Sequence, residues 1–180
     1  MITKAVLARG VGIIILVALS WRILACGLGD SYPGPVLDTL DWANLVFHEA
    51  GHFIFPVFGE FMQALGGSLM QLLIPVICTV HFWKRHEPAA SSVTLFWTGE
   101  SITHVAVYVA DAQRMELALT GDIHDWNYIL GKLNLLNQSE FLGQLAFFLG
   151  IATIVVALFV LAIDLIRICK RATVRNTEWT

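Results

Sequence analysis

Four long apolar segments constrain the fold of this chain more than any other feature. They cover residues 5–26, 60–83, 93–113 and 141–166. Each is long enough to cross a hydrocarbon core of about 30 Å, which takes about 20 helical residues. Hydrophobic residues make up 57% of the chain and charged residues only 14%, a balance typical of membrane proteins. The sequence therefore predicts one all-α integral membrane domain over residues 1–180.

A shorter apolar segment, 41–57, ends beside Pro56. Thr39 and Asp41 stand at its start, and both residue types cap helix N-termini well. We therefore expect a helix that begins near residue 41. This segment contains the sequence "HEAGH" at 48–52, so whether it crosses the membrane bears on function.

The basic residues favour four crossings over five. With four crossings every basic cluster lies on one face, as the positive-inside rule requires, whereas a fifth crossing would divide them. We therefore predict that both termini are cytoplasmic and that the 41–57 helix is interfacial or re-entrant on the outer side, together with residues 114–140. The clusters are Lys4 with Arg9, "KRH" at 84–86, and Arg167, Lys170, Arg171 and Arg175.

The N-terminal segment can also be read as a secretory signal. Lys4 and Arg9 precede its apolar core, and "ILAC" at 23–26 is similar to a bacterial lipoprotein cleavage site. Arg22, however, interrupts the core that such a signal needs. The sequence favours an uncleaved transmembrane helix whose Arg22 extends to the far interface.

Charge and cysteine content exclude some classes of protein. The formal net charge of −3 does not suggest nucleic-acid binding. Cys26, Cys78 and Cys169 are far apart and fit small buried thiols better than a zinc knuckle or a redox pair. Glycines at 66–67 and within 142–150 allow close helix packing, which is compatible with a homo-oligomer.

The motif "HEAGH" carries the clearest chemical signal. Residues four apart share a helix face, so His48 and His52 can offer two nitrogens to one cation. Glu49, about 100° around the helix, can reach a water on that cation and act as general base. The motif predicts a Zn²⁺ site. The alternative interpretation is a pair of interfacial histidines that hydrogen-bond to their neighbours.

A catalytic zinc usually has a third protein ligand and one open position. In the predicted topology the candidates on the outer side are Asp111, His124 and Asp125. His81 and His86 lie near the cytoplasmic end and are excluded. We favour His124 or Asp125 over Asp111, and the sequence does not choose between those two. Residues 125–136 are predicted to form a short helix.

Two further polar patterns interrupt the apolar segments. Glu100, His104 and Asp111 form one stripe, which must face the bundle or a watery cavity. An alternative interpretation of this stripe is a ladder of interhelical hydrogen bonds. In the last segment, Asp164 lies one turn before Arg167, where the two can meet at the membrane edge.

"HEAGH" at the outer edge of a polytopic chain, followed by "GGSLMQLLIP" at 66–75, resembles the site-2 proteases and their relatives. These are membrane-embedded zinc metallopeptidases. The resemblance implies that His48 and His52 bind zinc, that Glu49 activates water, and that Gln71 binds the substrate carbonyl. The family takes its third ligand from an Asp-Gly motif, and this chain contains no Asp-Gly dipeptide.

The sequence thus predicts a zinc-dependent metallopeptidase that hydrolyses a peptide or membrane-protein substrate at or near the outer membrane face. Gln71, or a backbone N–H near residues 66–67, would steady the oxyanion. Two other functions stay open. One is a di-iron enzyme, with Glu49 and His52 as half of the site and Glu100 and His104 as an imperfect second half. The other is a non-catalytic metal-binding membrane protein.

Overall fold

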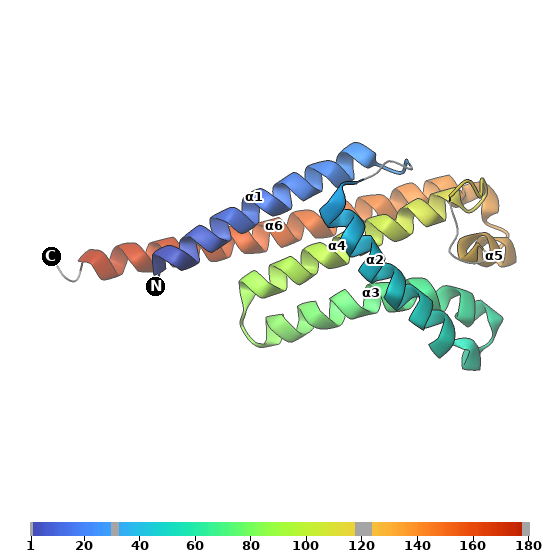
Figure 1. Ribbon diagram of the computed structural model, residues 1–180, viewed down its shortest axis with the longest axis horizontal. Helices are drawn as coiled ribbons and strands as arrows, with labels where there is room; N and C mark the ends of the chain where they lie inside the picture. Colours follow the sequence, from blue (N-terminus) through green and yellow to red (C-terminus); the bar gives the residue numbers. More distant parts are fainter. Residues whose placement is uncertain (1, 30–32, 118–123, 178–180) are drawn as a thin grey trace.

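The computed structural model describes residues 2–29, 33–117 and 124–177, and these ranges contain helices and no strand (Figure 1). The all-α prediction is confirmed. The helices are α1 (Ile2–Cys26), α2 (Pro35–Ile54), α3 (Glu60–Lys84), α4 (Pro88–Asp111), α5 (Asp125–Lys132) and α6 (Ser139–Thr177), with 3-10 turns at Pro56–Phe58 and Leu136–Gln138.

Three helices in the described part of the chain are long and apolar enough to cross a membrane. The qualifying stretches are Lys4–Cys26 of α1, Glu60–Lys84 of α3, and Leu136–Arg171, most of which is α6. Helix α4, with 24 residues, covers most of the remaining predicted segment, 93–113, but does not belong to this set. Its interior carries Glu100 and His104, which lower its hydropathy, and it packs between α3 and α6.

Helices α4 and α6 pack closely because small residues line their contact. A Cβ atom added at Gly99 would lie 2.7 Å from Ile154 Cγ1, and one added at Gly150 would lie 2.5 Å from Thr103 Cγ2. One added at Gly143 would meet Ala110 in the same way. Small residues that let two backbones approach are typical of helix packing in membranes. These two helices therefore form the central pair of the fold.

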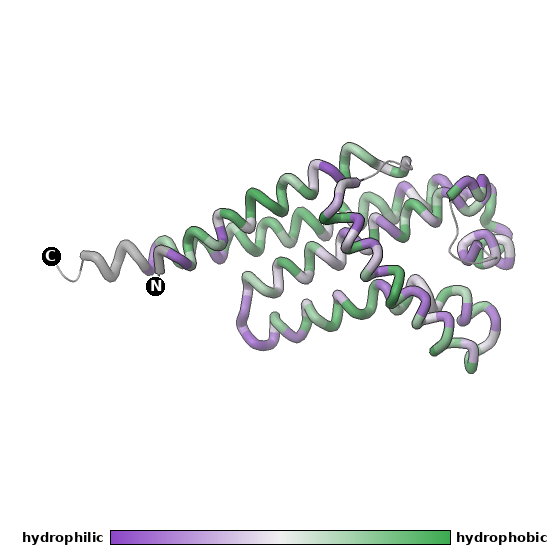
Figure 2. Tube along the Cα trace, viewed as in Figure 1, coloured by the Kyte–Doolittle hydropathy of each residue, from purple (hydrophilic) through white to green (hydrophobic). Residues whose placement is uncertain are grey.

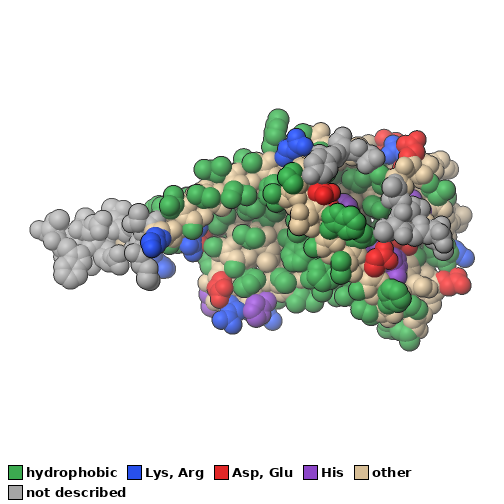
Figure 3. Space-filling view, in the orientation of Figure 1, with side chains coloured by type: hydrophobic (Ala, Val, Ile, Leu, Met, Phe, Trp, Pro, Cys, Tyr) green, Lys and Arg blue, Asp and Glu red, His purple; other side chains and the backbone are tan. Residues whose placement is uncertain are grey.

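Helix α1 lies along α6, and α2 crosses the bundle obliquely (Figure 1). Leu16 and Ile23 of α1 pack with Ile154 of α6, and Phe96 of α4 and Leu37 of α2 join the same cluster. Both chain termini lie at one end of the long axis, and α5 lies at the other end (Figure 1). The outer surface is strongly apolar over much of its length (Figures 2 and 3).

Two predicted helix boundaries were wrong. Helix α2 begins at Pro35 and not near residue 41, because proline at the first helical position lacks only an N–H that would have no helical partner there. It ends at Ile54, just before Pro56, as the proline requires. Helix α5 begins at Asp125 as predicted but ends at Lys132, four residues early.

The acidic residue of α6 pairs with α1. Asp164 Oδ2 accepts a hydrogen bond from Arg9 Nε at 2.8 Å, and the Asp164 side chain is 9% exposed. The sequence suggested Arg167 as its neighbour, but the packing of α1 on α6 brings Arg9 to this carboxylate instead. The ion pair thus links α1, near the start of the chain, to α6, near its end.

We expect Arg9→Ala to lower the free energy of unfolding by roughly 2–4 kcal/mol, because it leaves a buried carboxylate without its cation. Arg167→Ala, at an exposed position on α6, should change it by less than about 0.5 kcal/mol. Denaturant unfolding of the two variants in the same detergent checks this. Equal losses would contradict the assignment of the pair.

Candidate metal centre

His48 and His52 lie on one face of α2, as their spacing predicts. Their ring centroids are 4.8 Å apart and the rings stand nearly edge to face, with an interplanar angle of 75°. Both side chains are partly buried. The helix thus presents two imidazole nitrogens to the same space.

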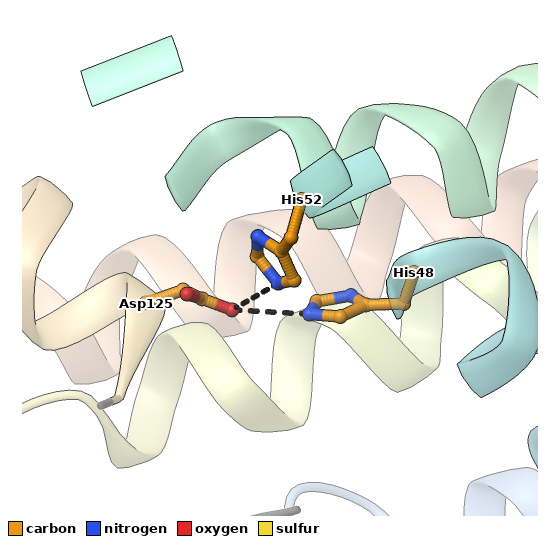
Figure 4. A group of neighbouring side chains, drawn as sticks. All are labelled: His48, His52 and Asp125. Atoms are coloured by element: carbon orange, nitrogen blue, oxygen red, sulfur yellow. Dashed lines mark hydrogen bonds and ion pairs between the residues drawn. The ribbon is translucent and has the colours of Figure 1, made fainter. Parts of the chain in front are cut away.

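Asp125, the first residue of α5, faces both histidines (Figure 4). Its Oδ2 lies 3.0 Å from His48 Nε2 and 3.1 Å from His52 Nε2. One ligand atom from each residue can be chosen so that all three lie within 4.8 Å of one another. Among the described residues, these three form the group with the spacing of a metal site. Two imidazole nitrogens and a carboxylate oxygen are donors that suit Zn²⁺.

The other two candidate ligands, His124 and Asp111, lie together and bind the backbone of the segment that follows α4. His124 Nε2 is 3.3 Å from Asp111 Oδ2, and both side chains are almost fully buried. Asp111 also accepts the backbone N–H groups of residues 116–117. His124 Nδ1 accepts the N–H of Asn127 and so caps α5. This pair fixes the start of α5 and therefore the position of Asp125.

The hydrogen bonds between Asp125 and the two histidines favour the charged forms of His52 and Asp125. The hydrogen bond to Asp125 raises the pKa of His52, with burial working against it and Glu49 adding to it. Burial works to raise the pKa of Asp125, but the hydrogen bonds from His48 and His52 outweigh it and hold that pKa below its usual value. A cation would replace the proton that these groups share, because metal ligands must be deprotonated.

The histidines lie directly against the backbone of α3 at Gly67. A Cβ atom added there would be 2.6 Å from Nε2 of His48 and 2.6 Å from Nε2 of His52. Gly51, inside "HEAGH", meets Gly66 in the same crossing, and a Cβ atom at Gly51 would overlap the Gly66 carbonyl. The glycines of "HEAGH" and "GGSLM" are therefore what lets α2 approach α3.

The second nitrogen of each histidine has its own partner. His52 Nδ1 donates to the backbone carbonyl of Gln63 at 2.8 Å, and His48 Nδ1 lies 3.3 Å from Gln71 Oε1. Each ring therefore directs Nε2 towards Asp125. Gln71 contacts His48 at the ring nitrogen that does not face Asp125. Glu49 is half-buried, and its charge acts on His52.

The polar stripe of α4 forms interhelical hydrogen bonds. Glu100 accepts from Asn44 Nδ2 at 3.0 Å, and Asn44 Oδ1 accepts from Trp97 Nε1 and Ser101 Oγ. This arrangement fits the hydrogen-bond ladder better than a second half of a di-iron site. Asn44 was not among the predicted site residues, although Asp41, Asn44, His48 and His52 follow one face of α2 and mark it as polar.

Comparison with known proteins adds no constraint. The chain matches no family model, no curated protein and no solved structure. The motif and the geometry of this centre are therefore the observations that bear on function.

We expect Gly67→Ala to weaken zinc binding at least about tenfold, because the new methyl group would displace both histidines. Gly10→Ala is the matched control, since a Cβ atom at Gly10 meets nothing within 4 Å. Zinc affinity of both variants, measured by competition with a chelator, checks this. Unchanged affinity in Gly67→Ala would contradict the close approach of the helices.

Proposed function

We propose that this chain is a membrane-embedded, zinc-dependent metallopeptidase that hydrolyses a peptide bond at or near the outer membrane face. The convergence of His48, His52 and Asp125 carries the proposal. Two histidines and a carboxylate are the ligands of many catalytic zinc sites, and Glu49 follows the first histidine as it does in zinc peptidases. The resemblance of "HEAGH" to the site-2 proteases supports the same reaction.

The residues divide into ligands and a base. Zinc would be held by Nε2 of His48, Nε2 of His52 and a carboxylate oxygen of Asp125. When bound, it supplies a Lewis acid that lowers the pKa of water and polarises a carbonyl. Glu49 takes the proton of the attacking water and returns it to the leaving amine. The predicted contact of Gln71 with the substrate carbonyl would be a second task for a side chain that already contacts His48.

The distribution of the basic residues supports the membrane topology that we propose for this chain. Helices α1, α3, α4 and α6 cross the membrane, and both termini are cytoplasmic. Helix α2 lies in the outer interface or enters the membrane and returns. Its exposed stripe of Trp42, Val46 and Phe53, with Phe53 85% exposed, would face acyl chains. Its polar face, with Asn44 buried, turns towards the bundle.

Metal analysis tests the proposed centre. We expect about one zinc per chain in the wild type, and none in His48→Ala, His52→Ala or Asp125→Ala. Glu49→Gln should keep the zinc and lose peptidase activity on casein by about 10²-fold or more, because it cannot accept the proton. His81→Ala, an exposed histidine on α3, is the matched control and should behave as the wild type.

Other results would overturn parts of the proposal. Zinc retained in all three ligand variants would place the metal elsewhere. Two irons per chain would favour the di-iron enzyme, and full activity of Glu49→Gln would remove the catalytic base. A folded, freshly prepared protein that holds no metal would refute the zinc site.

Cysteine labelling tests the topology. In a chain whose three cysteines are replaced by serine, we expect Asn137→Cys to react with a membrane-impermeant maleimide on intact cells. Lys84→Cys should react only after permeabilisation, because it lies at the cytoplasmic end of α3. The cysteine-free chain is the control. Labelling of both positions from the same side would contradict four crossings.

A further inference from the structure

A chain of polar contacts leads from His48 into the helical bundle. His48 Nδ1 lies 3.3 Å from Gln71 Oε1, and Gln71 Nε2 lies 3.1 Å from His104 Nδ1. His104 Nε2 in turn lies 3.8 Å from Asp41 Oδ1. Gln71 is 2% exposed, so its amide has little access to water. The contacts link α2, α3 and α4, the three helices around the centre.

The direction of the Gln71 amide determines which nitrogen of His48 is free. With Oε1 towards His48, the ring must donate from Nδ1, and a neutral ring then has no proton on Nε2. Nε2 is the atom that faces Asp125, and a cation there would take the place of the proton that Asp125 accepts from it. With the amide reversed, its NH₂ group would need Nδ1 as an acceptor. The proton would then sit on Nε2 and block a cation.

His104 decides between these two directions. In the observed one, Gln71 donates to His104 Nδ1, so the proton of a neutral His104 is on Nε2 and points to Asp41. In the reversed one, His104 would donate from Nδ1, and its bare Nε2 would face Asp41 Oδ1. That oxygen is buried and has no hydrogen-bond partner within 3.5 Å. Two acceptors would then oppose each other, which is unfavourable at a buried site.

We propose that Gln71 and His104, oriented by Asp41, are positioning residues that hold His48 with its proton on Nδ1 and its Nε2 free for the cation. This inference depends on the zinc site proposed above. It gives Gln71 a role distinct from substrate binding. Orientation of metal-bound histidines by a partner at the other ring nitrogen commonly tunes metal affinity.

The two histidines differ in what holds them. His52 donates to a backbone carbonyl, that of Gln63, which no side-chain substitution removes. His48 is held by the side chain of Gln71. Substitution of Gln71 should therefore change the orientation of His48, while His52 keeps its orientation.

Zinc affinity and histidine NMR of the full chain in detergent micelles test this. We expect Gln71→Leu to raise the Kd for zinc about 10–100-fold, as is typical for loss of such a partner. Gln71→Glu keeps an acceptor opposite His48 and should stay within about threefold of the wild type. Gln144→Leu, the same change at an exposed position of α6, is the matched control.

The NMR measurement separates orientation from general damage to the fold. In zinc-loaded protein, the Nδ1–H proton of His48 should be observable in the wild type and in Gln71→Glu. In Gln71→Leu it should disappear through exchange with water, while that of His52 persists. If Gln71→Leu does not fold, Gln71→Asn answers the question, because it keeps the amide but is one methylene too short to reach both rings.

The outcomes distinguish this inference from the proposed function. Wild-type binding that depends on His48 and His52, with unchanged affinity in a folded Gln71→Leu or Gln71→Asn, would overturn the positioning role and leave the zinc site standing. A wild type that binds no zinc would overturn both.

Discussion

The approach of α2 to α3 through bare glycine backbone is the contact on which the rest of the centre depends. Gly51 and Gly66 leave no side chain between the two helices, and Gly67 leaves room for both imidazoles. Any larger residue at these positions would push α2 away from α3. Asp125 would then no longer reach both rings, since it is held from α5 and not from α2. The glycines thus affect the candidate metal site by setting the distance between α2 and α3.

Several polar groups inside this apolar bundle are paired between helices. Asn44 hydrogen-bonds to Glu100, Trp97 and Ser101 of α4, and so fixes α2 on α4. Trp126 donates to Ser68 and fixes α5 on α3. Unpaired polar groups would be costly in this setting, so each pair also discourages a shift of one helix along another.

The sequence predicted the parts of the fold that depend on local pattern. Apolar runs located α1, α3 and α6, and the spacing of His48 and His52 placed them on one helix face. The ends of α2 were only half predicted, because Pro56 signals a stop clearly whereas Pro35 is compatible with either a turn or a helix start.

What depends on long-range packing was not predictable. Asp125 lies 77 residues from His48, and nothing local distinguishes it from His124. The difference arises because His124 turns to Asp111 while Asp125, one residue later, faces the other way. The partner of Asp164 was missed for the same reason, since Arg9 is 155 residues away. These contacts require the tertiary arrangement of the helices.

The candidate ligands come from two separate helices, α2, which crosses the bundle, and the short α5 at one end of it. A cation bound here would cross-link α2 to α5 and so close the stretch of chain between them, which contains α3 and α4. Cross-links of this kind restrict the unfolded chain, and metal binding energy becomes folding energy. The long helices have their own packing and do not need it. A bound cation would thus tie α5 to α2, in addition to the contact that α5 already makes with α3 through Trp126 and Ser68.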